Sequence, residues 1–252
     1  MQKVHLAPLW SVVAGVAGLA LIDRLNALSA AGWCAGLLYL GVSNAFLARG
    51  LRRSGTARFG PANATTAARS TLVGIVTAIV ATSFTAPVSV ALLLWLAVPA
   101  LALDAVDGWL ARRTNTTSEL GARFDMEVDA FLLLVLSAYL VPQLGWWVIT
   151  IGMLRYAFVA VGWMLPWMVA TLPPRYWRKV VTATAGIALA VAASTLTPWW
   201  VDYAVTLVAL GLLIESFARD VIWLVVEHRN APVSSPARGA AQPFEGRAHP
   251  QS

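Results

Sequence analysis

Residues 88–110 read VSVALLLWLAVPALALDAVDGWL, and no charged residue interrupts the apolar run from Val90 to Leu103 before Asp104. A helix needs about 20 mostly apolar residues to cross the hydrocarbon layer of a membrane. Every backbone polar group inside that layer has to be hydrogen-bonded within the segment, which a helix achieves. The stretch therefore predicts a membrane-spanning helix that ends in an acidic segment.

The rest of the chain has the same character. Its 252 residues are 59% hydrophobic and only 12% charged, with a mean hydropathy of +0.70. These values lie outside the usual range of soluble domains. We therefore predict an all-α fold, a polytopic membrane helical bundle, with a six-span core preceded by two extra N-terminal spans. The predicted spans are 4–22, 27–48, 66–86, 88–110, 120–141, 145–165, 180–197 and 200–226.

Basic residues sort to one side of these spans. The formal charge is +6, yet most of the 18 Lys and Arg residues fall in alternate loops and at span ends, which indicates orientation in a membrane and no nucleic-acid partner. The opposite loops hold only Arg24, while Arg155 and Arg219 lie inside spans. The positive-inside tendency makes the basic side cytoplasmic. Its residues are Lys3, Arg49, Arg52, Arg53, Arg58, Arg69, Arg112, Arg113, Arg123, Arg175, Arg178, Lys179, Arg229, Arg238 and Arg247.

Composition divides the chain into four segments. We predict two accessory transmembrane spans in 1–48, a basic cytoplasmic juxtamembrane linker in 49–62, a six-span core in 63–228 and a disordered cytoplasmic tail in 229–252. A cleaved signal peptide that ends near Ser29 is the alternative interpretation of the first span.

Acidic residues gather where two predicted spans meet. Half of the 12 acidic residues fall within residues 104–129. Residues three or four apart share a helix face, so Asp104 and Asp107 share one face, as do Asp125 and Asp129. If the two helices are antiparallel neighbours across the short loop, the four carboxylates converge at the membrane edge. Four like charges at one point require a cation.

The predicted cation is a hard divalent ion. The chain has one cysteine and three histidines that lie near its ends, so no zinc-type cluster is available. Oxygen ligands without His or Cys favour Mg²⁺ or Mn²⁺. The alternative is that these acids cap helix ends or pair with Arg112, Arg113 and Arg123 at the level of the headgroups. Glu127, two residues from Asp125, is predicted to point away from the cluster.

The same window carries a longer pattern. It reads DAVDGWLAR from Asp104 and GARFDMEVD up to Asp129. This pattern resembles the signature D-x2-D-G-x2-A-R-x8-G-x3-D-x3-D of the CDP-alcohol phosphotransferases, and every fixed position and spacing agrees. Upstream, Asn63, Thr66 and Arg69 resemble the N-x2-T-x2-R motif that the family directs toward cytidine. Read alone, Asn63 is equally an N-cap.

The resemblance implies a set of roles. Asp104, Asp107 and Asp125 would bind metal, with Asp129 at a second ion and as the base on the acceptor hydroxyl. Two Mg²⁺ or Mn²⁺ ions, CDP-diacylglycerol as the donor, CMP as the leaving group and a homodimer follow from the family. The implied CDP-binding residues are Asn63, Thr66, Gly108, Ala111, Arg112 and Gly121.

Arg155 lies near the centre of the span 145–165, where a cation needs a polar cavity or a counter-charge. Glu215 is one candidate partner. Glu215 and Arg219 are four residues apart, however, and could instead pair within one helix.

A second basic group follows on the next cytoplasmic loop. Arg175, Arg178 and Lys179 would, with Arg155, suit an acceptor that itself carries phosphate. A contact between this loop and lipid headgroups is the alternative.

These observations predict a metal-dependent CDP-alcohol phosphatidyltransferase of phospholipid biosynthesis, in the plasma membrane with its active site at the cytoplasmic face. We expect the acceptor to be a phosphorylated polyol, either glycerol 3-phosphate or inositol phosphate, with serine and phosphatidylglycerol as alternatives. A divalent-cation transporter is the alternative from another class, but its acids would lie along a pore near mid-membrane.

Overall fold

The computed structural model describes residues 7–54, 61–114, 119–165 and 176–230, with side chains described for 11–49, 65, 67–103, 124–165 and 177–229. Within these ranges the chain forms eight α-helices and one short 3-10 helix, without strands. The predicted all-α bundle is confirmed, and each predicted span overlaps one helix. The elements are α1 (Ala7–Leu25), α2 (Ala30–Ser54), α3 (Pro61–Ser83), α4 (Val90–Thr114), α5 (Glu119–Leu144), η1 (Trp146–Val148), α6 (Ile149–Met164), α7 (Tyr176–Ala193) and α8 (Trp199–Asn230).

Polar side chains order the helix starts at one end of the bundle. Ser29 Oγ accepts the backbone N–H of Gly32 at 3.0 Å in α2, and Ser89 Oγ accepts that of Leu92 at 3.3 Å in α4. Serine at such a position satisfies one of the amides that a helix start leaves without a partner. Asn26 Oδ1 also accepts the backbone N–H of Ser89 at 3.1 Å. The α1–α2 and α3–α4 turns therefore lie side by side.

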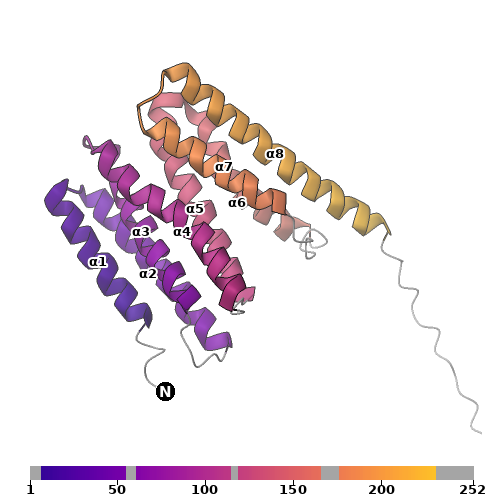
Figure 1. Cartoon of the computed structure of the whole chain (residues 1–252), viewed down its shortest axis with the longest axis horizontal. Coiled ribbons are helices and arrows are strands. Elements are labelled where there is room, and N and C mark those ends of the chain that lie inside the picture. The colour runs from indigo at the N-terminus through magenta and orange to yellow at the C-terminus, as the bar shows by residue number, and fades with distance from the viewer. Residues whose placement is uncertain (1–6, 55–60, 115–118, 166–175, 231–252) are drawn as a thin grey trace, which may run out of the picture.

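Helix α3 is the centre of the N-terminal half, because it packs against α1, α2, α4 and α5 (Figure 1). Helix α5 packs against α3, α6 and α7, and α7 packs along α8. Fully buried side chains such as Val73 and Ile79 of α3 and Leu132 and Leu136 of α5 fill the core. Direct contact between α4 and α5 is slight, and α4 packs chiefly on α3 and α7.

Two glycines allow neighbouring helices to come close. A Cβ on Gly32 of α2 would lie 2.2 Å from Thr82 Oγ1 and 2.7 Å from the carbonyl oxygen of Ala78, both in α3. A Cβ on Gly152 of α6 would lie 2.2 Å from Leu134 Cα in α5. Small residues at helix contacts permit this close approach in membrane bundles. Helices α2 and α6 are thus closely packed on the core.

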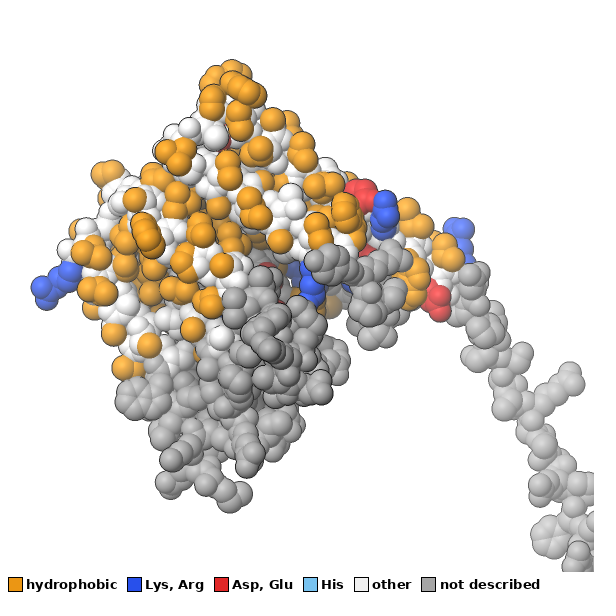
Figure 2. Space-filling model, in the orientation of Figure 1, with side chains coloured by type: hydrophobic (Ala, Val, Ile, Leu, Met, Phe, Trp, Pro, Cys, Tyr) orange, Lys and Arg blue, Asp and Glu red, His pale blue; other side chains and the backbone are white. Residues whose placement is uncertain are grey.

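The surface suits a lipid environment. Three segments of the described chain are long and apolar enough to cross a membrane: Ala30–Arg49, Trp146–Met164 and Trp199–Arg229, with mean hydropathies of 1.3, 1.5 and 1.7. In Figure 2 hydrophobic side chains are spread over the whole described face, and charged side chains show in only a few places. Trp95 and Trp163 are about four-fifths exposed, at 78% and 82%. The chain is an integral membrane protein.

The predicted segment boundaries do not all fall at helix ends. Helix α2 continues to Ser54 and α3 begins at Pro61, so helix occupies both ends of the predicted linker 49–62. Residues 55–60 and most of the predicted tail, 231–252, lie outside the described residues. The division of the chain into these segments stays a prediction.

Candidate active site

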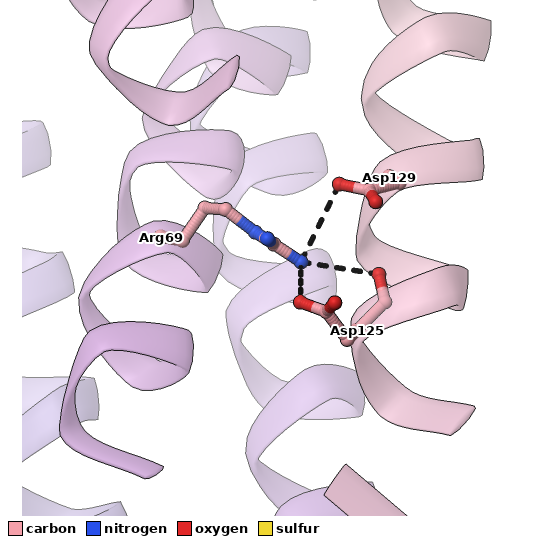
Figure 3. A network of polar contacts seen from close by, with 3 residues as sticks. All are labelled: Arg69, Asp125 and Asp129. Atoms are coloured by element: carbon pink, nitrogen blue, oxygen red, sulfur yellow. Dashed lines mark hydrogen bonds and ion pairs between the residues drawn. The ribbon is translucent and has the colours of Figure 1, made fainter. Parts of the chain in front are cut away.

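The first half of α5 carries Asp125 and Asp129, one helical turn apart. Both carboxylates turn toward α3 (Figure 3), and their side chains are 27% and 19% exposed. The four-residue spacing places them on the same face, as predicted from the sequence.

Arg69 of α3 lies between these two carboxylates. Its side chain is completely buried, and its Nη2 donates to the carboxylate of Asp125 and, at 3.1 Å, to the main-chain oxygen of the same residue. The Nη2 atom also lies 3.4 Å from Asp129 Oδ1. The guanidinium therefore joins α3 to both acidic turns of α5.

Burial explains why this arrangement needs charges of both signs. Removing a guanidinium from water costs several kcal/mol, and the cost is recovered only when anions lie close to it. At 3.4 Å the Coulomb attraction between Arg69 and Asp129 is about 5 kcal/mol for an effective dielectric constant of 20. Taken by themselves, the three side chains carry one formal negative charge, a sign that suits a bound cation.

The residues present fit a divalent metal. Asp125 and Asp129 offer only oxygen ligands from one face, and Mg²⁺ is commonly bound by one or two carboxylates together with substrate phosphates. Among the described residues, no group of three or more His, Cys, Asp or Glu side chains lies together. The side chains of Asp104 and Asp107 lie outside the described part, although both residues belong to α4. Convergence of all four carboxylates stays a prediction.

The residues predicted to bind CDP belong to three helices at this end of the bundle. Helix α3 begins at Pro61, so Asn63 lies inside its first turn and is not the N-cap. The side chains of the predicted CDP residues lie outside the described part of the structure. These residues are Asn63 and Thr66 in α3, Gly108, Ala111 and Arg112 in α4, and Gly121 in α5.

Arg155 pairs with Glu127, and the candidate partner Glu215 lies elsewhere. Arg155 Nη2 donates to Glu127 Oε1 at 2.8 Å, which joins α6 to α5. Their side chains are 30% and 49% exposed. Glu127 thus points away from Asp125, as its spacing predicts. Arg155 Nε is buried and has no hydrogen-bond partner among the described residues, so the guanidinium retains a donor.

The second basic group lies at the start of α7. Arg178 Nη1 is 3.5 Å from Asp220 Oδ2 of α8, and Asp220 is almost completely buried. Lys179 is exposed, and Arg175 lies outside the described residues.

Glu215 of α8 contacts two neighbouring side chains. It pairs with Arg219, four residues later, as the alternative from the sequence had it, and it accepts a hydrogen bond from Trp177 Nε1 at 3.0 Å. Of the two alternatives that the sequence left open for Glu215, the structure has the pairing with Arg219, and Arg155 pairs with Glu127 instead.

Sequence reasoning missed the contact between Arg69 and the acidic pair. The sequence places Arg69 among the basic residues of the cytoplasmic side, and the resemblance directs it toward cytidine. A signal was present, because Arg69 is the one charged residue between 66 and 86 in an otherwise apolar or neutral stretch. A buried cation in such a span requires an acidic partner on another helix.

Comparison with known proteins gives one match. A family model described as CDP-alcohol phosphatidyltransferase matches residues 60–216, which is more than half of the chain. The match runs from the start of α3 into α8 and includes Arg69, Asp125 and Asp129. No curated protein and no solved structure matches the chain at a significant level.

Proposed function

The chain belongs to the CDP-alcohol phosphatidyltransferase family, and from that membership we propose that it transfers a phosphatidyl group from CDP-diacylglycerol to a small alcohol with release of CMP. The family carries out phospholipid head-group transfer from CDP-alcohols. The observation that carries the proposal is the Asp125–Asp129 pair, which faces a buried Arg69 within the matched region.

In the proposed reaction the hydroxyl oxygen of the acceptor attacks the phosphorus atom that bears the diacylglycerol. The bond from this phosphorus to the CMP oxygen breaks, and CMP leaves with the electron pair. Asp129 accepts the proton of the attacking hydroxyl as a general base. Its contact with Arg69 at 3.4 Å is looser than that of Asp125, which suits a carboxylate that exchanges partners during turnover.

We propose that Asp104, Asp107, Asp125 and Asp129 hold two divalent ions, either Mg²⁺ or Mn²⁺. When bound, such ions neutralise the diphosphate and stabilise the charge of the leaving group. Arg112 would contribute charge-assisted hydrogen bonds to phosphate oxygens, and Asn63, Thr66, Gly108, Ala111 and Gly121 would line the CDP site. An Asp107→Asn variant should bind Mg²⁺ more weakly, which calorimetry on the purified protein can measure without turnover.

We propose a phosphorylated polyol, glycerol 3-phosphate or inositol phosphate, as the acceptor. Arg155, Arg175, Arg178 and Lys179 would bind its phosphate. The side chain of Arg155 supports this role, because it is 30% exposed and its ion pair with Glu127 does not use the Nε donor. The acceptor phosphate would then add a charge-assisted hydrogen bond without breaking that ion pair.

The proposed setting is the plasma membrane, with the site at the cytoplasmic face and two copies of the chain associated as a homodimer. The basic residues of the predicted cytoplasmic side support the orientation. The family resemblance supports the dimer.

The test is CMP release from CDP-diacylglycerol by the purified full-length protein, with Mg²⁺ and a panel of glycerol 3-phosphate, inositol phosphate, serine and phosphatidylglycerol. Release that depends on one alcohol and is lost in Asp129→Asn supports the proposal. No release with any alcohol, together with Mg²⁺ flux into vesicles that contain the protein, would favour a divalent-cation transporter instead.

A further inference from the structure

Helix α2 precedes the region that matches the family, yet it carries polar side chains toward the site. Tyr39, Ser43 and Asn44 lie within its apolar segment, and Ser43 and Asn44 are only 6% and 8% exposed. Polar groups at such a depth are costly unless they find partners. Helix α2 packs along α3 and also contacts α5, the two helices that hold Arg69 and the carboxylates.

Ser43 is linked to the residue that follows Arg69. The hydroxyls of Ser43 and Ser70 form a hydrogen bond between α2 and α3, and both residues are buried. Because Ser70 directly follows Arg69, this bond fixes the backbone turn that carries the guanidinium. The hydrogen bond joins two neutral side chains that are both buried, so water has little access to replace it.

Tyr39 reaches the helix that carries the carboxylates. Its ring stacks on Phe131 of α5 with 4.7 Å between ring centroids and an interplanar angle of 23°. Phe131 lies two residues after Asp129. The stack therefore holds α2 against the acidic half of α5 and sets the depth of the Tyr39 hydroxyl.

The hydroxyl of Tyr39 is buried without a completed hydrogen bond among the described residues. The hydroxyls of Ser43 and Ser70 interact with it without reaching full hydrogen-bond geometry, and it is within electrostatic reach of Arg69 and Asp129. Leaving a buried hydroxyl unsatisfied costs about 1–3 kcal/mol. A phenylalanine would avoid that cost and keep the stack, so the packing of α2 does not by itself explain the hydroxyl.

We propose that Tyr39 and Ser43 are positioning residues for the transferase reaction, and that α2 forms a third wall of the site beside α3 and α5. During turnover, substrate phosphates compete for Arg69 and cations compete for Asp129, so the contact between these two residues has to open. The Tyr39 hydroxyl can then donate to the carboxylate or accept from the guanidinium. Ser43 keeps the Arg69 turn in place through Ser70. The inference rests on the proposed function, and it replaces for α2 the expectation of a merely accessory span.

The experiment compares Tyr39→Phe and Ser43→Ala with the wild type in the full-length protein. Tyr39→Phe removes one oxygen atom and keeps the stack on Phe131. The control is Tyr203→Phe in α8, whose hydroxyl donates to the Leu144 carbonyl oxygen at 3.0 Å, at the opposite end of α5. Each variant is assayed for kcat and for KM with CDP-diacylglycerol, per mole of folded protein, using the alcohol that supports CMP release by the wild type.

The expected result separates kcat from KM. Tyr39→Phe should lower kcat about tenfold or more, as loss of a hydrogen bond to a charged group does, with KM for CDP-diacylglycerol within about twofold of wild type. Ser43→Ala should lower kcat in the same direction, and Tyr203→Phe should change melting temperature only. Wild-type kcat in both α2 variants, or equal losses in all three, would overturn the inference alone. No CMP release by the wild type with any alcohol would refute the proposed function, and the inference with it.

Discussion

Replacement of Arg69 by methionine should destabilise the folded protein, and divalent cations should reverse part of that loss. Methionine keeps an unbranched apolar stem in the buried position but removes the guanidinium. The change takes away the positive charge that lies between Asp125 and Asp129. Two half-buried carboxylates one turn apart then repel each other more strongly, so they attract a metal ion more strongly.

The structure bounds the size of the effect. Removal of one partner from a buried ion pair typically costs about 3–5 kcal/mol. The carboxylates keep some hydration, with 27% and 19% of their side chains exposed, so the lower value of about 3 kcal/mol applies. For a chain of this length each kcal/mol shifts the melting temperature by about 2–4 °C, which predicts a fall of about 6–12 °C. Mg²⁺ at ten times its Kd should return about 1.4 kcal/mol.

The assay is thermal unfolding of the purified protein followed by tryptophan fluorescence, with and without Mg²⁺. Arg219→Met is the matched control. Arg219 is 65% exposed and pairs with Glu215 in the same helix, so its loss should cost at most about 1 kcal/mol and leave the Mg²⁺ response unchanged. The wild type should gain less from Mg²⁺ than Arg69→Met, because in the wild type the ion competes with Arg69 for the carboxylates. An equal or smaller Mg²⁺ shift in Arg69→Met would refute the reasoning.

Three further predictions concern catalysis, the acceptor and helix packing. Asp129→Asn should lower kcat at least about 100-fold while CDP-diacylglycerol still binds, since general-base catalysis contributes about 10²–10⁴-fold. Retention of a tenth of wild-type kcat would contradict the base role. Arg155→Ala should raise KM for a phosphorylated acceptor about 10- to 150-fold, as loss of a contact worth about 1.5–3 kcal/mol implies. KM for the CDP-lipid should change little, and an equal rise in KM for both substrates would indicate a structural role alone. Gly152→Ala should cost about 1–3 kcal/mol, because the new Cβ meets the Leu134 backbone at 2.2 Å. Gly211→Ala has nothing within 4 Å of the new Cβ, so it should keep or slightly raise the melting temperature. Similar melting temperatures for the two variants would show that α6 moves aside without cost.

The local pattern of the sequence was sufficient to predict the positions of the helices and one half of the acidic site, the pair Asp125 and Asp129. Apolar runs of membrane length predict where each helix lies, because the backbone in lipid has no other way to satisfy its polar groups. The four-residue spacing of Asp125 and Asp129 places them on one face for the same geometric reason. Glu127 lies two residues from each of them, so it points away from that face.

Spacing along one helix cannot say which other helix supplies the partner. The slight contact between α4 and α5, with α3 packed against both, was not predictable from the short loop that joins them. Arg155 could have met any acidic residue at its depth, and packing of α6 on α5 through Gly152 brought it to Glu127.

By itself, then, the sequence determined an all-helical membrane protein with an acidic site at one end, since hydrophobic length, charge and helical periodicity are local properties of the chain. Only the tertiary structure decided that Arg69 of α3 pairs with the carboxylates of α5, that Ser43 of α2 bonds to Ser70 of α3, and that Tyr39 of α2 stacks on Phe131 of α5. Those contacts join residues far apart in the chain, and they depend on how closely helices pack and on which buried charges must meet.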